Sequence, residues 1–163
     1  MDLKQLSEEI DYLKKRLANL EHKKLNETKR FEVEVPDDIE TYYTINTRGE
    51  LQILSFYSRS IQEELYKRGE AFEISDNALS NNREKILLKK LEDWAEEHNG
   101  DWYPNWEDCD DKFYIAYHHG LSWFKVCSNM RVNAFNKLPY FKSNELALEF
   151  IEEFGDEIKE VLF

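Results

Sequence analysis

The chain has 163 residues, with 22 basic and 34 acidic side chains and a formal net charge of −12. Aromatic residues make up 14% of it, more than a disordered protein carries, so we expect a folded core. No stretch reaches the ~18 apolar residues of a membrane span. The acidic balance also disfavours general affinity for nucleic acid or anionic lipid, because it repels phosphate.

The cysteines and the first residues indicate a compartment. Cys109 and Cys127 form neither a disulfide framework nor a Cys-x-x-Cys motif, which is typical of a reduced cytosol. The charged start Met1-Asp2-Leu3-Lys4 differs from a signal peptide. We therefore expect a cytoplasmic protein that has no membrane partner.

A heptad pattern occupies the first segment. Its apolar residues are spaced alternately by three and four positions: Leu3, Leu6, Ile10, Leu13, Leu17 and Leu20. This spacing predicts a coiled-coil helix over residues 1–25 that forms a parallel dimer. In that dimer Glu9 faces Lys14 of the second copy, so the flanking charges attract. The alternatives are a helix that docks on its own folded body or on a foreign partner.

Charge separates this helix from the rest of the chain. Residues 1–30 hold 8 basic and 6 acidic side chains, whereas the remainder holds 14 and 28, a net charge of −14. Residues 26–40 are predicted to be a polar linker. The excess of acidic side chains therefore lies in the body and in the end of the linker that precedes it, not in the helix.

The body divides into two stretches with the same predicted order of elements, residues 41–100 and 101–163. In the first, two β-rich runs, Tyr42–Thr47 and Leu51–Tyr57, flank an Arg48-Gly49 turn and predict a hairpin. A polar loop, a short strand at Phe72–Ser75 and a helix from about Asn82 to His98 follow.

The second stretch repeats that order. Phe113–His119 and Leu121–Cys127 flank Gly120, a short strand follows at Tyr140–Ser143, and Ser143 is a natural N-cap for a last helix. The match indicates two related ββ-β-α units, although two unrelated hairpins would give a similar pattern. We predict an α+β fold with antiparallel sheet and packed helices.

Four segments carry a family resemblance: Tyr42–Glu50, Leu88–Asn99, Lys112–Tyr117 and Tyr140–Ala147. Together they resemble small accessory proteins encoded by phages and prophages of Gram-positive bacteria, in which a leading coiled coil is common. The resemblance implies an accessory phage protein and supplies no catalytic residues. Small acidic phage proteins often block host defence, and some inhibit CRISPR nucleases.

Catalytic and metal-binding patterns are absent from the sequence. His118 and His119 are adjacent on a predicted strand, so their side chains point to opposite faces and cannot chelate one ion together. Nucleophile and nucleotide-binding motifs are also missing. We predict a protein that is not an enzyme and that has no metal and no cofactor.

Aromatic and acidic residues are the candidates for partner binding. Trp102 and Trp106 are typical anchors, and four acids follow them: Glu107, Asp108, Asp110 and Asp111. The alternative role of the two tryptophans is to seal the junction between the two stretches. The alternative for the four acids is a solvated turn.

The function we predict is inhibition of a host defence protein, with a nucleic-acid-binding CRISPR nuclease as the leading candidate. The acidic surface would compete for the partner's nucleic-acid channel and would not bind nucleic acid directly. The alternatives are a coiled-coil assembly protein and a binder of a small ligand such as a signalling nucleotide.

Overall fold

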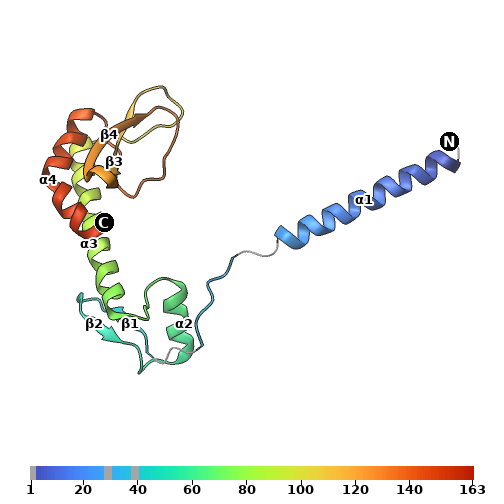
Figure 1. Cartoon of the computed structure of the whole chain (residues 1–163), viewed down its shortest axis with the longest axis horizontal. Coiled ribbons are helices and arrows are strands. Elements are labelled where there is room, and N and C mark those ends of the chain that lie inside the picture. Colours follow the sequence, from blue (N-terminus) through green and yellow to red (C-terminus); the bar gives the residue numbers. More distant parts are fainter. Residues whose placement is uncertain (1–2, 28–30, 38–40) are drawn as a thin grey trace. The chain divides into compact units, whose positions relative to one another are not determined.

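The computed structural model describes residues 3–27, 31–37 and 41–163. The chain separates into two units, Met1–Asp37 and Asp38–Phe163. Helix α1, Leu3–Glu27, forms most of the first unit, so the predicted helix is confirmed over its described part (Figure 1). Residues 28–30 and 38–40 of the predicted linker lie outside the described residues.

The second unit starts with the predicted hairpin. Strand β1 (Tyr43–Ile45) pairs with β2 (Leu51–Ile53) in an antiparallel register. The Asn46 side chain holds the turn, because its oxygen accepts hydrogen bonds from the backbone N–H groups of Arg48 (2.9 Å) and Glu50 (3.0 Å). Gly49 adopts a φ of +82°, which a residue without a Cβ reaches without strain.

Helix α2, Arg59–Lys67, was not predicted, since this stretch was assigned to a polar loop. Gln62, only 8% exposed, anchors the helix by donating to the carbonyls of Leu54 (3.0 Å) and Tyr57 (2.9 Å). These hydrogen bonds satisfy two backbone carbonyls in the segment that follows β2. The strand therefore ends at Ile53 and not at the predicted Tyr57.

The second hairpin is longer. Strand β3 (Lys112–His118) pairs with β4 (Trp123–Asn129), and a short 3-10 helix, η1 (His119–Leu121), joins them. The predicted hairpin is confirmed, although its turn is longer than the single Gly120 suggested. Ser122, with a φ of +51°, takes the left-handed conformation there.

Each hairpin gains a third, one-residue strand on the same side. In the first half Phe72 pairs with Tyr43, with both N···O distances at 2.8 Å. In the second half Phe141 pairs with Phe113, at 2.8 and 3.0 Å. In both halves the short strand therefore adds to the first strand of the hairpin and leads into a long helix.

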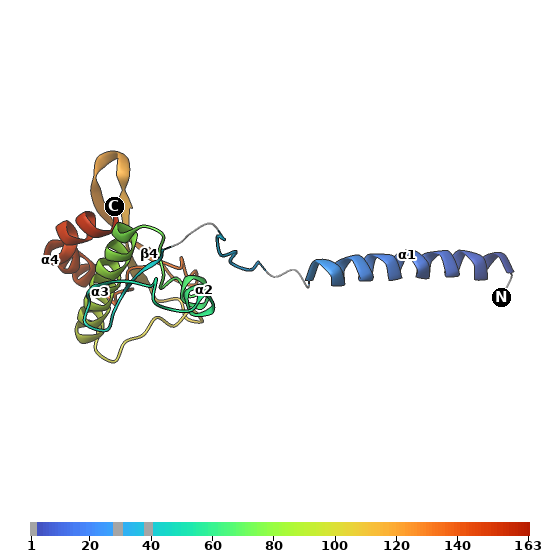
Figure 2. The same ribbon diagram turned by 90° about the horizontal axis from the view of Figure 1, so that it is seen from below.

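Two helices follow these bridges and lie side by side, as the two views show (Figures 1 and 2). Helix α3 spans Ser75–Asn99 and starts well before the predicted Asn82, while it ends at Gly100 as expected. Helix α4 spans Asn144–Leu162, and the hydroxyl of Ser143 caps it by accepting from the backbone N–H of Leu146 (3.3 Å).

The main core lies between the C-terminal half of α3, α4 and β3. Its members are Leu87, Leu91, Ala95, Ile115, Phe141, Ala147, Phe150, Phe154 and Ile158. Trp94 covers one side with edge contacts to Phe150 (5.4 Å) and Phe154 (5.9 Å). The N-terminal half of α3 instead supports the first hairpin, where Ala78 is fully buried. One helix therefore serves both halves.

The predicted α+β class is confirmed, with helices packed against two small antiparallel sheets. Within the described residues, none of the helices has both the length and the apolar character that crossing a membrane requires.

Candidate functional site

The heptad residues of α1 are solvent-exposed in the described part of the helix. Exposure is 45% for Ile10, 54% for Leu13, 60% for Leu17 and 57% for Leu20. The side chains of Leu3 and Leu6 lie outside the described residues. Such a seam can associate with another helix, and the parallel coiled-coil dimer stays a prediction.

Trp102 and Trp106 are each related to Tyr140, Trp106 by ring contact and Trp102 by a shared groove. The ring of Trp106 packs edge-on against Tyr140 with centroids 5.0 Å apart, and Tyr140 also contacts Tyr114 at 5.8 Å. Trp102 and Tyr140 both line a shallow groove of about 200 Å³. Both tryptophans are half-buried. Part of each ring is therefore packed within the segment that follows α3, and part is accessible to a partner.

The groove also contains residues beyond the predicted anchors and acids. Tyr103 is 73% exposed, and Glu92 and Glu96 reach the groove from α3. The two glutamates are spaced i, i+4 and therefore share one face of the helix, a signal that was available in the sequence. We call the combination of Glu92, Glu96, Trp102, Tyr103, Trp106 and Tyr140 the acidic–aromatic surface.

The acidic loop contains one residue that is committed to the fold. The ammonium of Lys112, whose side chain is 1% exposed, pairs with the carboxylate of Asp108 and donates to the backbone carbonyl of Asp110 (2.8 Å). The hydrogen bond from Lys112 lowers the pKa of Asp108 below its ordinary value, and the backbone N–H of Asp110 adds to this effect. Asp108 therefore neutralises a buried cation.

The other predicted acids are exposed. Glu107, Asp110 and Asp111 are open to solvent, so their charges stay available to a partner. Arg131 approaches the same loop, where its guanidinium lies 3.0 Å from the sulfur of Cys109. The structure thus divides the four predicted acids into one structural residue and three surface residues.

The histidines serve local structure. The Nδ1 atom of His118 accepts a hydrogen bond from the backbone N–H of Leu121 (3.2 Å). The ring of His119 contacts Tyr117 (4.9 Å) and Phe163 (5.0 Å). Across residues 9–21, 31–37 and 41–163, whose side chains the structure describes, no three His, Cys, Asp or Glu side chains lie close enough to hold a metal ion.

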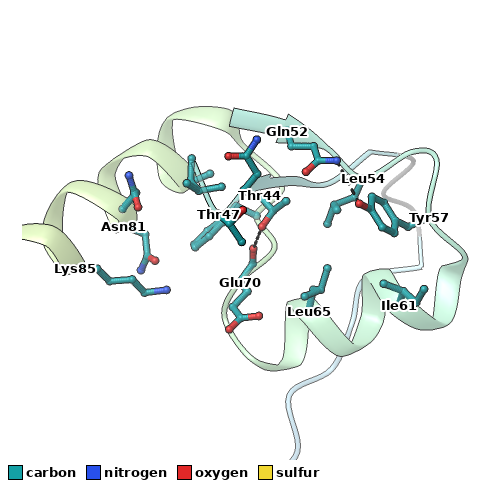
Figure 3. A pocket seen from close by; sticks show the side chains of 15 residues that line it. Thr44, Thr47, Gln52, Leu54, Tyr57, Ile61, Leu65, Glu70, Asn81 and Lys85 are labelled. Atoms are coloured by element: carbon teal, nitrogen blue, oxygen red, sulfur yellow. Dashed lines mark hydrogen bonds between the residues drawn. The ribbon is translucent and has the colours of Figure 1, made fainter. Parts of the chain in front are cut away.

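A larger groove lies in the first half, between the β1–β2 hairpin, α2 and α3 (Figure 3). Its volume is about 650 Å³, within the range of about 300–1,000 Å³ that small-molecule sites occupy. The close-up shows apolar Leu54, Ile61 and Leu65 toward one end and Asn81 and Lys85 at the other. The sequence did not indicate this groove, because its walls come from residues scattered between Thr44 and Lys85.

Comparison with known proteins gives no match: no protein-family model, no curated protein and no solved structure is similar to this chain. The function is therefore inferred from the residues and their geometry.

Proposed function

We propose that this chain is a phage-encoded, non-enzymatic binding protein that inhibits a host defence protein through its acidic–aromatic surface. The partner would be a nucleic-acid-binding protein, with a CRISPR nuclease as the leading candidate. The observation that supports this proposal is the groove that the exposed ring of Tyr103 and the half-buried ring of Trp102 line together with Glu92 and Glu96.

Such a groove suits a cationic side chain of the partner. An arginine or lysine can place its charge over the face of an aromatic ring, and a nearby carboxylate then adds an ion pair. Tyr103 offers the exposed ring and Glu96 the carboxylate. Basic residues that normally hold phosphates would therefore find both types of contact at one place.

Helix α4 would add long-range attraction. Its 19 residues include seven acids and one basic residue, Lys159. Clustered charge of one sign steers an oppositely charged partner and makes its association rate depend on salt. We therefore expect the complex to weaken as the salt concentration rises from about 50 to about 500 mM, because the Debye length shrinks.

The test is a tagged pull-down from Gram-positive host lysate at both salt concentrations, read by mass spectrometry. We expect the wild type to retain one nucleic-acid-binding protein at low salt. The double variant Glu92→Lys/Glu96→Lys should lose it, whereas Glu149→Lys/Glu152→Lys, which reverses two exposed charges on α4, should weaken capture less, because it reduces only the long-range attraction.

Inhibition is then measured directly with the purified partner. Its nucleic-acid binding should fall when the wild-type chain is added and should persist with the Glu92→Lys/Glu96→Lys variant. A partner whose capture is the same at both salt concentrations and for both variants would contradict the electrostatic mechanism.

A second candidate function, assembly through α1, is favoured by the exposed heptad seam. In that case Leu13→Asp and Leu17→Asp would convert a dimer into a monomer in analytical ultracentrifugation and would abolish activity. A monomeric variant that still inhibits the partner would rule out assembly as the function.

A further inference from the structure

The groove of Figure 3 has two chemically different ends. Leu54 (1% exposed), Ile61 and Leu65 form an apolar end between the hairpin and α2. At the other end α3 contributes Asn81, Asn82 and Lys85. An occupant that satisfies both ends needs an apolar body and a polar head.

Several polar side chains of the groove already have partners. The Thr44 hydroxyl donates to the carbonyl of Glu70 (2.6 Å), and the Gln52 amide donates to the hydroxyl of Tyr57 (3.3 Å), as the dashed lines in Figure 3 show. The Asn46 amide donates to the carboxylate of Glu50 (3.0 Å). These groups build the fold and offer little to a ligand.

The donors on α3 are different. Within the part of the chain that the structure describes, the side chains of Asn81, Asn82 and Lys85 make no hydrogen bond or ion pair. Lys85 follows Asn81 by four residues and Asn82 by three, so the three side chains share one face of the helix. Two half-buried amides and one ammonium therefore converge on one end of the groove with unused donors.

The charge of the groove favours an anion. Among the described lining residues, Lys85 is the basic one and Glu70 the acidic one. The carboxylate of Glu70 accepts a hydrogen bond from the guanidinium of Arg68 (3.1 Å), which offsets its charge. Lys85 has no such partner among the described residues.

We propose that this groove binds a small organic anion. Its carboxylate or phosphate accepts hydrogen bonds from Asn81, Asn82 and Lys85, while its apolar body covers Leu54, Ile61 and Leu65. The groove shares no residue with the acidic–aromatic surface, so the ligand site and the proposed partner binding stand or fall separately.

The test uses the full chain, labelled with ¹⁵N, and four probes: 1-naphthyl phosphate, 1-naphthoate, 1-naphthol and inorganic phosphate. We expect at least one naphthyl anion to bind about tenfold more tightly than 1-naphthol and inorganic phosphate, because only the anions use both ends of the groove. The side-chain amide signals of Asn81 and Asn82 should shift. The phosphate and carboxylate probes show which anionic group the groove prefers.

Matched variants show which residues contribute to the affinity for the anion. Lys85→Gln should weaken binding of the preferred naphthyl anion about fivefold and leave 1-naphthol unchanged, as expected for one partly exposed charge. Lys89→Gln, which removes a lysine one turn further along α3 and outside the groove, should have no effect. Glu70→Gln should strengthen anion binding.

Three results would overturn the proposal: equal affinity for 1-naphthol and both naphthyl anions, unchanged anion affinity in Lys85→Gln, or signal shifts confined to residues outside the groove.

Discussion

The two halves of the folded unit share a hairpin, a one-residue strand and a long helix in that order, but only the first inserts α2, and they differ in how they pack. Phe72 and Phe141 form the same backbone bridge in their respective halves, yet Phe141 is fully buried in the core while Phe72 is half-buried at the wall of the groove. Seven-residue strands and large aromatic side chains fill the second half; three-residue strands leave an open groove in the first. The comparison shows that two halves with similar backbone topology can differ in packing. Strand length and side-chain volume determine whether a core fills or a groove remains.

The largest effect should come from the filled half. Phe150→Ala removes a fully buried ring from the centre of the core and should lower the free energy of unfolding by about 3–5 kcal/mol. Denaturant titration of the full chain measures this change. Leu148→Ala, at a position that is 52% exposed on the same helix, should cost well under that amount. Similar costs for the two variants would show that the second half is not the better packed one.

A smaller effect is expected in the half with the groove. Leu54→Ala removes a buried side chain whose surroundings open to solvent, so the cost should lie near the lower end for such changes, about 2 kcal/mol. Hydrogen exchange should show faster opening of β1 and β2 with little change in β3 and β4. Equal loss of protection in both hairpins would mean that the two halves open together.

The smallest effect concerns the residue before each bridge. Tyr42 and Lys112 occupy equivalent positions and are both buried, but only Lys112 brings a charge that needs Asp108. The lowered pKa of Asp108 means that its stabilising effect is present above its unfolded pKa of about 4 and is lost as the pH falls through the folded value.

We therefore expect Asp108→Asn to destabilise the fold at neutral pH and to remove part of the stability loss that occurs as the pH falls below about 4. Lys112→Met should be close to neutral at pH 7, because it removes the buried charge together with the need for its partner. Asp111→Asn, at an exposed position of the same loop, serves as the control. An unchanged pH profile in Asp108→Asn would contradict the assigned role of the pair.

Local patterns predicted the features that depend on neighbouring residues. The two hairpins, the Ser143 cap and the end of α3 at Gly100 follow from alternation, capping and turn chemistry within a few residues. Helix α2 was missed because Gln62 stabilises it through carbonyls of Leu54 and Tyr57, which lie in the preceding segment.

The candidate sites were harder to predict. The sequence singled out Trp102 and Trp106, but it could not show that Glu92 and Glu96 of a preceding helix would line the same groove as Trp102. It also grouped Asp108 with the other acids of the loop, because nothing in the sequence distinguishes a lysine that is buried at the start of a strand from a solvated one. Both features depend on contacts that only the tertiary structure creates.

The sharing of α3 between the halves has a practical consequence for dissecting the protein. A fragment starting at Asp101 would lack Leu87, Leu91 and Ala95, and the aromatic side chains of α4 that pack against them would face water. A fragment ending at Gly100 would expose the same three residues. The two halves are therefore expected to survive separation only by complementation, in which two co-expressed pieces reassemble around the helix that both require.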